Sequence, residues 1–508
     1  MQQPKPPKMT TSLLLHLPQE LLDRFVDDLG EEYLNSFTFN YGDQEIRMAL
    51  QACLSVSRSF HDRAAIYLFR QVLLTDKAGR EMSTRLSLLR QIMPPTVDGQ
   101  IPGITSYIKR FTLILNGVRP TPRDLFQEDN EGQKDVIKYL SSEDLSAILR
   151  DLRSETYGVE ILVIRITTMR NVKWTILPPH FQSAMLFLIR SPYLTSLQLH
   201  KFSRLPPNLL NGTTLKDVRL EQLDTSDREA PESPIDYPQT PLPCPKLEVF
   251  QTDNAFPVDF DPITSPLSQL KKLKTYSVLP EHYRDTRRIL QLAHDSLEVL
   301  RLDFSGTCSH FPLSIPQPHV LSHLTAGDID FLSESINIGT IPNLRFLAIM
   351  HFRSFGTPFR PVNDTNTNTI CDILDISTPL PKLTELELEF HFNEVNVHET
   401  FLHPHPDSYW QRIDHLLTGG KYPSLEKFKL ELSCDIILED AEIAFDKKSF
   451  LKSTRARFRE AFPRICASEK ITFEIANDAS VIREGDNGYS DIGGSDSDSA
   501  LVNGEVEF

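Results

Sequence analysis

A short hydrophobic motif with the spacing LxxLxL recurs along the middle of this 508-residue chain. Its nine copies begin at Leu194, Leu215, Leu247, Leu273, Leu297, Leu321, Leu344, Leu383 and Leu425. Two earlier stretches, from Ile108 and from Ile161, can be read in the same way. Intervals of 21 to 42 residues between copies are typical of stacked supersecondary units, which expose long rows of strand side chains. We therefore expect a binding surface rather than a catalytic pocket.

Within each motif, the fourth and sixth positions share one face of a strand, because strand side chains alternate with a period of two. Helix-like segments precede most copies, for example residues 142–152 before Ile161 and residues 283–296 before Leu297. Helix followed by strand, repeated, predicts an α/β fold with a parallel sheet and helices along its other side. The pattern resembles the curved leucine-rich-repeat solenoid. The Asn or Cys that usually follows the motif is mostly missing, so we expect less regular loops.

The strand residues between the buried positions should form the concave face of such a solenoid. Two groups among them are candidates for binding a target protein: the apolar pair Phe346 and Met350, and the charged set Glu385, Glu387, Glu389, Lys427 and Lys429. Exposed contiguous apolar residues usually mark a binding site. The charged set has an alternative interpretation, which we favour, in which neighbouring strands neutralise each other by cross-strand pairing.

The N-terminal part predicts three short amphipathic helices. Residues 16–30 repeat apolar side chains at helical spacing, and Gly30 is a plausible C-cap. Residues 45–60 place Met48, Cys53 or Ala52, and Val56 along one stripe, and residues 61–74 end as a short strand. A bundle of this size has little core of its own and often depends on a partner.

The stretches "LPQELLDRFVDDL" and "ALQACLSVSRSFHDRAAIYLFRQVLL" closely resemble the F-box of fungal, mushroom-type F-box proteins. The resemblance covers residues 14–75. It departs in a longer loop over residues 31–45, and Phe60 replaces the usual Trp. The resemblance implies docking on a Skp-type adaptor and, through it, on a cullin. The residues implied for this contact and its support are Leu17, Pro18, Leu21, Leu22, Phe25, Val56 and Phe60. The alternative is that several of them form only the core of the bundle.

Composition divides the chain into four parts. Residues 1–11 are expected to be disordered, residues 12–75 form the F-box-like module, and residues 76–478 form the solenoid with a proline-rich insertion at 224–245. Residues 479–508 are an acidic segment that is too polar to offset its ordering entropy. A net charge of −16 argues against nucleic-acid binding. The absence of a long apolar run or signal peptide favours a cytoplasmic or nuclear protein without membrane contact.

The search for catalytic chemistry finds no convincing site. Gly419-Gly420-Lys421 lacks the other residues of a phosphate-binding loop. His398 and His403 are five residues apart with Pro404 after them, whereas zinc-binding histidines on one helix are four apart. We therefore expect no enzyme, metal or cofactor. The leading hypothesis is a substrate-recognition subunit of a ubiquitin ligase, and the alternative is a repeat scaffold that binds proteins without any role in ubiquitin transfer.

Overall fold

The computed structural model describes residues 18–37, 44–76, 82–94, 103–116, 131–168, 171–206, 209–221, 246–253, 265–276, 280–304, 336–354, 365–396, 409–438 and 445–483. Within these residues the chain is a mixed α/β protein with one large, entirely parallel sheet. The expected parallel sheet is therefore confirmed.

Twelve strands form this sheet, and their order in space follows their order in the chain. They are β1 (Gln71–Thr75), β2 (Arg110–Leu115), β3 (Ile161–Ile166), β5 (Ser196–His200), β7 (Asp217–Glu221), β8 (Val249–Asp253), β9 (Lys272–Tyr276), β10 (Val299–Asp303), β11 (Phe346–Ser354), β12 (Glu385–Asn396), β13 (Lys427–Leu438) and β14 (Thr472–Arg483). The short strands β4 (Val172–Lys173) and β6 (Phe202–Ser203) pair separately.

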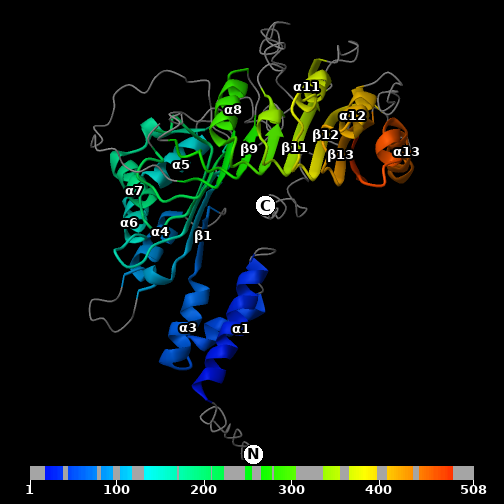
Figure 1. The fold of residues 1–508 in the computed structure, drawn as a ribbon. Helices are drawn as coiled ribbons and strands as arrows, with labels where there is room; N and C mark the ends of the chain where they lie inside the picture. Colours follow the sequence, from blue (N-terminus) through cyan, green and yellow to red (C-terminus); the bar gives the residue numbers. More distant parts are fainter. Residues whose placement is uncertain are drawn as a thin grey trace, which may run out of the picture.

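Helices precede most of the strands and cover one face of the sheet (Figure 1), although none of the described helices lies between β5 and β9 in the chain. They are α4 (Met82–Ile92), α5 (Glu131–Leu140), α6 (Glu143–Asp151), α7 (Pro179–Ile189), α8 (Pro280–Ala293), α11 (Thr365–Leu374), α12 (Tyr409–Thr418), α13 (Lys447–Ala461) and α14 (Pro463–Cys466), with 3-10 turns at Thr105–Tyr107, Trp174–Ile176 and Ile338–Thr340. Figure 1 shows the sheet bending so that its helix-free face is concave.

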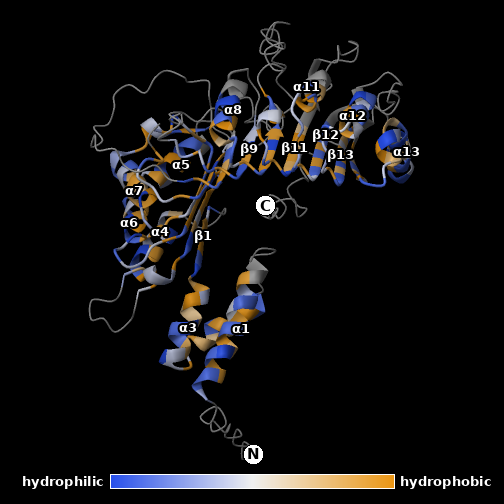
Figure 2. Ribbon diagram, in the orientation of Figure 1, coloured by the Kyte–Doolittle hydropathy of each residue, from blue (hydrophilic) through white to orange (hydrophobic). Residues whose placement is uncertain are grey.

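The predicted alternation of buried and exposed strand residues is present. Leu300 and Leu302 of β10 are buried against the helices, while Val299 and Arg301 between them are only half-buried on the other face. Leu300 lies beside Leu273 and Leu347 of the two neighbouring strands, so the leucines form continuous rows. Figure 2 shows hydrophobic and hydrophilic residues alternating along these strands. One contiguous core results, running from β1 to β14.

The carbonyl oxygen of the residue before one strand accepts hydrogen bonds from the start of the following strand. The carbonyl oxygen of Lys271 accepts two hydrogen bonds, from the N–H groups of Glu298 and Val299, at 2.8 and 2.9 Å. The carbonyl oxygen of Glu298 accepts in the same way from Arg345 and Phe346, at 2.8 and 3.1 Å. These paired bonds align the amino ends of the strands along one edge of the sheet.

The structure corrects the register of two motifs. The strand expected from Leu273 belongs to a motif that begins at Leu270, because Leu273 occupies the buried position beside Leu300 and Tyr276 lies on the concave face. The stretch read from Ile161 similarly begins at Val159, whose burial with Leu162 and Ile164 reproduces the spacing. The copy at Leu321 lies outside the described residues.

Two predicted boundaries also change. The third N-terminal helix and β1 are separated by only two residues, and β1 pairs with β2. The segment expected to form the helical module, residues 12–75, therefore includes the first strand of the sheet. Strand β14 continues to Arg483, past the expected end of the solenoid at residue 478, because Asp435 to Leu438 of β13 still pair with it. Residues 1–11, the insertion at 224–245 and residues 484–508 lie outside the described residues.

Candidate functional site

The N-terminal module consists of α1 (Gln19–Phe37), α2 (Gln44–Cys53) and α3 (Arg58–Leu68). Figure 1 shows it projecting beyond the β1 end of the sheet. Its hydrophobic core is separate from that of the sheet and contains only six buried residues, which are Val26, Tyr33, Leu50, Cys53, Phe60 and Ala64. A core this small leaves little room for further apolar side chains, which must then lie on the surface.

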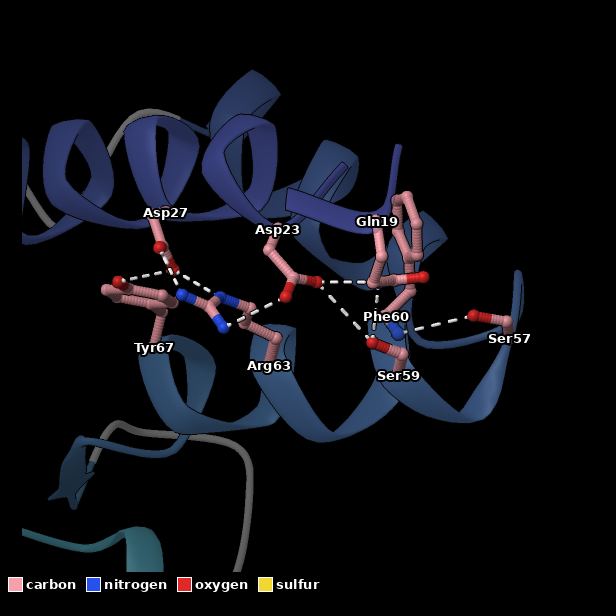
Figure 3. A network of polar contacts seen from close by, with 8 residues as sticks. All are labelled: Gln19, Asp23, Asp27, Ser57, Ser59, Phe60, Arg63 and Tyr67. Atoms are coloured by element: carbon pink, nitrogen blue, oxygen red, sulfur yellow. Dashed lines mark hydrogen bonds and ion pairs between the residues drawn. The ribbon is translucent and has the colours of Figure 1, made fainter. Parts of the chain in front are cut away.

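A polar network fixes α1 against α3 (Figure 3). The guanidinium of Arg63 donates to both carboxylate oxygens of Asp27 at 2.7 and 2.5 Å, and it also binds Asp23 at 3.3 Å. The hydroxyl of Tyr67 donates to Asp27 at 2.9 Å. The hydrogen bonds from Arg63 hold the pKa of the Asp27 carboxyl below its usual value, although desolvation acts in the opposite direction. Asp27 therefore remains charged, and the two helices keep one relative orientation.

Gly30 permits the close approach of these helices. A Cβ atom at Gly30 would lie 2.2 Å from the ring of Tyr67, so only glycine fits at this position. The expectation that Gly30 caps the first helix was wrong, because α1 continues through it to Phe37. The longer helix also includes residues 31–37, which the sequence had placed in a loop.

Two large apolar side chains of α1 are open to solvent. Leu21 and Phe25 are 54% and 56% exposed. They lie one turn apart, and each is two residues from a carboxylate, Asp23 or Asp27, that faces α3. Residues two apart on an α-helix point about 200° apart, so the apolar pair faces away from α3.

Two further exposed apolar side chains lie on the second helix of the module and in the turn after it. Met48 of α2 is 53% exposed and Val56, which follows α2, is 58% exposed. We call Leu21, Phe25, Met48 and Val56 the apolar ridge. Solvent-exposed apolar groups of this size are the ordinary basis of protein docking.

The structure places the predicted adaptor-binding residues in different environments. Leu21, Phe25, Val56 and Pro18 are exposed, whereas Leu22 is half-buried in the module core. Phe60 is also buried in that core, at the start of α3, where the Ser57 hydroxyl accepts a hydrogen bond from its N–H at 3.3 Å. Phe60 therefore supports the ridge instead of belonging to it. Leu17 lies outside the described residues.

Met48 was missed as an exposed residue. The sequence placed Met48, Cys53 or Ala52, and Val56 along one stripe. In the structure Cys53 is buried with Leu50, beside Ile46, whereas Met48 and Val56 are exposed. The spacing of Ile46, Leu50 and Cys53 is four and three residues, which is also helical. That spacing could have identified the inner face.

The charged residues of the concave face pair with one another. Lys429 binds Glu387 of the neighbouring strand at 2.5 Å and Glu431 of its own strand at 2.8 Å. Lys427 binds Glu385 at 3.1 Å and Glu474 of β14 at 3.3 Å. The favoured interpretation, cross-strand neutralisation, is thus seen in the geometry. These four contacts satisfy both lysines without a target protein.

Glu389 has a different partner. Its carboxylate lies 2.8 Å from the ring Nε2 of His391, and the hydrogen bond to Glu389 is the main cause that raises the pKa of His391. Asp303 and Glu431 raise it further by charge, whereas burial acts in the opposite direction.

The apolar candidates of the concave face, Phe346 and Met350, are less exposed than the four side chains of the apolar ridge. Ala348, between Phe346 and Met350, is 8% exposed. The guanidinium carbon of Arg301 lies 5.2 Å from the centre of the Phe346 ring and covers part of it. Phe346 and Met350 are both half-buried. The expected apolar patch is therefore narrow, because side chains of adjacent strands pack across it.

No set of three His, Cys, Asp or Glu side chains among the described residues is placed to hold a metal ion. The candidate histidines His398 and His403 lie outside those residues. None of the described helices combines the length and the hydrophobicity needed to cross a membrane. In comparisons with known proteins, no family model matches the chain, and no curated protein is significantly similar to it.

Proposed function

We propose that this chain is the substrate-recognition subunit of a ubiquitin ligase of the Skp-type adaptor and cullin class. The helical module, as an F-box, would bind the adaptor through its apolar ridge. The sheet and its helices, as a degenerate leucine-rich-repeat solenoid, would hold a target protein. The chain itself would catalyse no reaction, and it would act by raising the effective concentration of target lysines near the charged ubiquitin carrier.

The observation that supports this proposal most is the exposure of the apolar ridge. All four of its side chains are more than half exposed. Leaving such groups in water costs roughly 25 cal/mol for each Å² of apolar surface relative to burying them. A partner that covers the ridge would recover this free energy. The polar network of Arg63 and Asp27 supports the proposal further, because it holds α1 with the ridge facing outward.

Capture of a purified Skp-type adaptor by the full chain tests the proposal. Changing Phe25→Lys together with Val56→Lys should abolish capture, because two charges would enter an apolar contact. The matched control is Leu88→Lys with Ile92→Lys on α4, where the side chains are 55% and 52% exposed. This control should capture the adaptor as the wild type does.

An intact chain that never captures an adaptor would contradict the proposal. If such a chain still bound other proteins through the solenoid, the alternative of a scaffold without a role in ubiquitin transfer would be supported. Equal loss of capture in both double variants would show that the effect is a general one of added surface charge, and the ridge would then have no special role.

A further inference from the structure

A groove of about 590 Å³ lies along the edge of the sheet where strands β7 to β12 begin. Its inner row consists of the residues that immediately precede five consecutive strands, which are Lys216, Glu248, Lys271, Glu298 and Arg345. Their backbone groups make the paired hydrogen bonds that align the strand starts. The floor of the groove is therefore rigid.

The charges of the inner row largely compensate each other. The Glu248 carboxylate lies 3.1 Å from Lys271 and 3.9 Å from Lys216. The Glu298 carboxylate lies 3.9 Å from Arg345. The three cations of this row are thus each close to a carboxylate, and this row alone would attract a charged partner only weakly.

The outer row has a different composition. Each of its residues lies three positions before the first residue of one of the strands β8 to β12. The row consists of Lys246, Gln269, Ser296, Asn343 and Lys382. The row contains a lysine at each end, three neutral polar side chains between them and no carboxylate. Lys246 has no polar partner among the described residues, and Lys382 donates only to the amide oxygen of Asn343, at 2.6 Å.

The groove is positive on a strongly negative protein. Its lining contains five cations and, with Asp295, three carboxylates, whereas the whole chain has a net charge of −16. Lys246 precedes β8 and Lys382 precedes β12, and these two strands are four strand spacings apart in the sheet. At the usual spacing of about 4.8 Å, the separation is about 19 Å. An extended peptide covers that distance with about six residues, at about 3.3 Å per residue.

We propose that this groove binds an extended acidic segment of a partner protein, with carboxylates about six residues apart contacting Lys246 and Lys382. Of the polar side chains between the lysines, Ser296 donates to the carbonyl oxygen of Leu270 at 2.9 Å and Asn343 to that of Asp295 at 2.6 Å, so the lysines supply the charge that such a segment would contact. Together with the proposed function, on which this step rests, the inference identifies the target as a protein with an acidic extended segment. It places recognition at the strand-entry edge and not on the concave face, whose charges are already paired.

Fluorescence anisotropy with a labelled octaglutamate peptide and the full chain tests the inference. The wild type should bind the peptide, and added salt should weaken binding because the attraction is electrostatic. Changing Lys246→Glu together with Lys382→Glu should weaken binding about tenfold or more, since both ends of the groove would then repel the peptide. The matched control is Lys448→Glu with Lys452→Glu on α13, which makes the same change in net charge elsewhere and should bind as the wild type does.

Absence of binding by the wild type, or equal binding by both double variants, would overturn the inference. The acidic residues 484–508 of the same chain are a competing occupant. Carbodiimide crosslinks between these residues and Lys246 or Lys382 within one molecule would assign the groove to them and also overturn it. Adaptor capture is a separate readout: the Lys246→Glu, Lys382→Glu variant should still capture the adaptor, so failure of one proposal is distinguishable from failure of the other.

Discussion

The helical module and the sheet differ in how many of their hydrophobic side chains they bury. The sheet buries nearly all of them in one core that continues from β1 to β14, and each strand is covered by its neighbours. The hydrophobic core of the module contains six buried residues, yet the module has five of the ten large hydrophobic side chains that are exposed among the described residues. The sheet therefore keeps its apolar surface largely internal, whereas the module leaves a larger share of its apolar side chains in water.

The largest expected effect concerns the two faces of the sheet. Leu347→Ala removes a fully buried side chain from the middle of the core and should lower the free energy of unfolding by about 2–5 kcal/mol. Phe346→Ala, one residue away on the concave face, should cost less than about 1 kcal/mol, because that side chain is half-exposed. Urea unfolding followed by circular dichroism measures both values. Equal costs would show that the concave face is as tightly packed as the core.

A smaller effect is expected where the module depends on one close contact. Gly30→Ala should destabilise the module by about 1–3 kcal/mol, because the new methyl group overlaps the ring of Tyr67. Hydrogen exchange should become faster in α1 and α3 and stay unchanged in the sheet. Adding Tyr67→Ala should recover part of the loss. Faster exchange throughout the chain would mean that the two cores unfold as one unit.

The smallest effect is a pH dependence confined to the sheet. Because the pKa of His391 is raised in the folded state, its contribution to stability is fully present below the unfolded-state pKa of about 6.5 and is lost as the pH rises through the folded-state value. The contribution should be less than about 1 kcal/mol, since the ion pair with Glu389 is partly exposed. His391→Gln should flatten this part of the stability profile, measured by thermal unfolding between pH 5 and pH 9. An unchanged profile would exclude His391 as its source.

Much of the sheet could be predicted from the sequence, because the buried strand positions of LxxLxL are occupied by hydrophobic residues at a regular spacing. The register was less secure where leucines occur in both phases, as at Leu270 and Leu273. The paired carbonyl contacts and the neighbouring rows of leucines select one phase there. Local spacing contains no information about those neighbours.

The candidate site was predicted in part. Of the residues named for adaptor contact and its support, Leu21, Phe25 and Val56 are exposed and Phe60 is buried, whereas the exposed Met48 was not among them. An amphipathic pattern identifies apolar residues, and it does not say which of two apolar stripes faces the core when both are present. The groove at the strand-entry edge was not predicted at all, since its eleven lining residues come from six segments spread between residues 216 and 382.

By itself, the sequence determined the recurrence of helices and strands, the parallel sheet and most of the leucine rows in its core. These features follow from periodicity, which is a local property of the chain. Only the tertiary structure decided which apolar side chains stay in water and which charged groups neutralise each other. Both depend on distances between segments that are far apart in the chain, because burial and Coulomb interaction act through space.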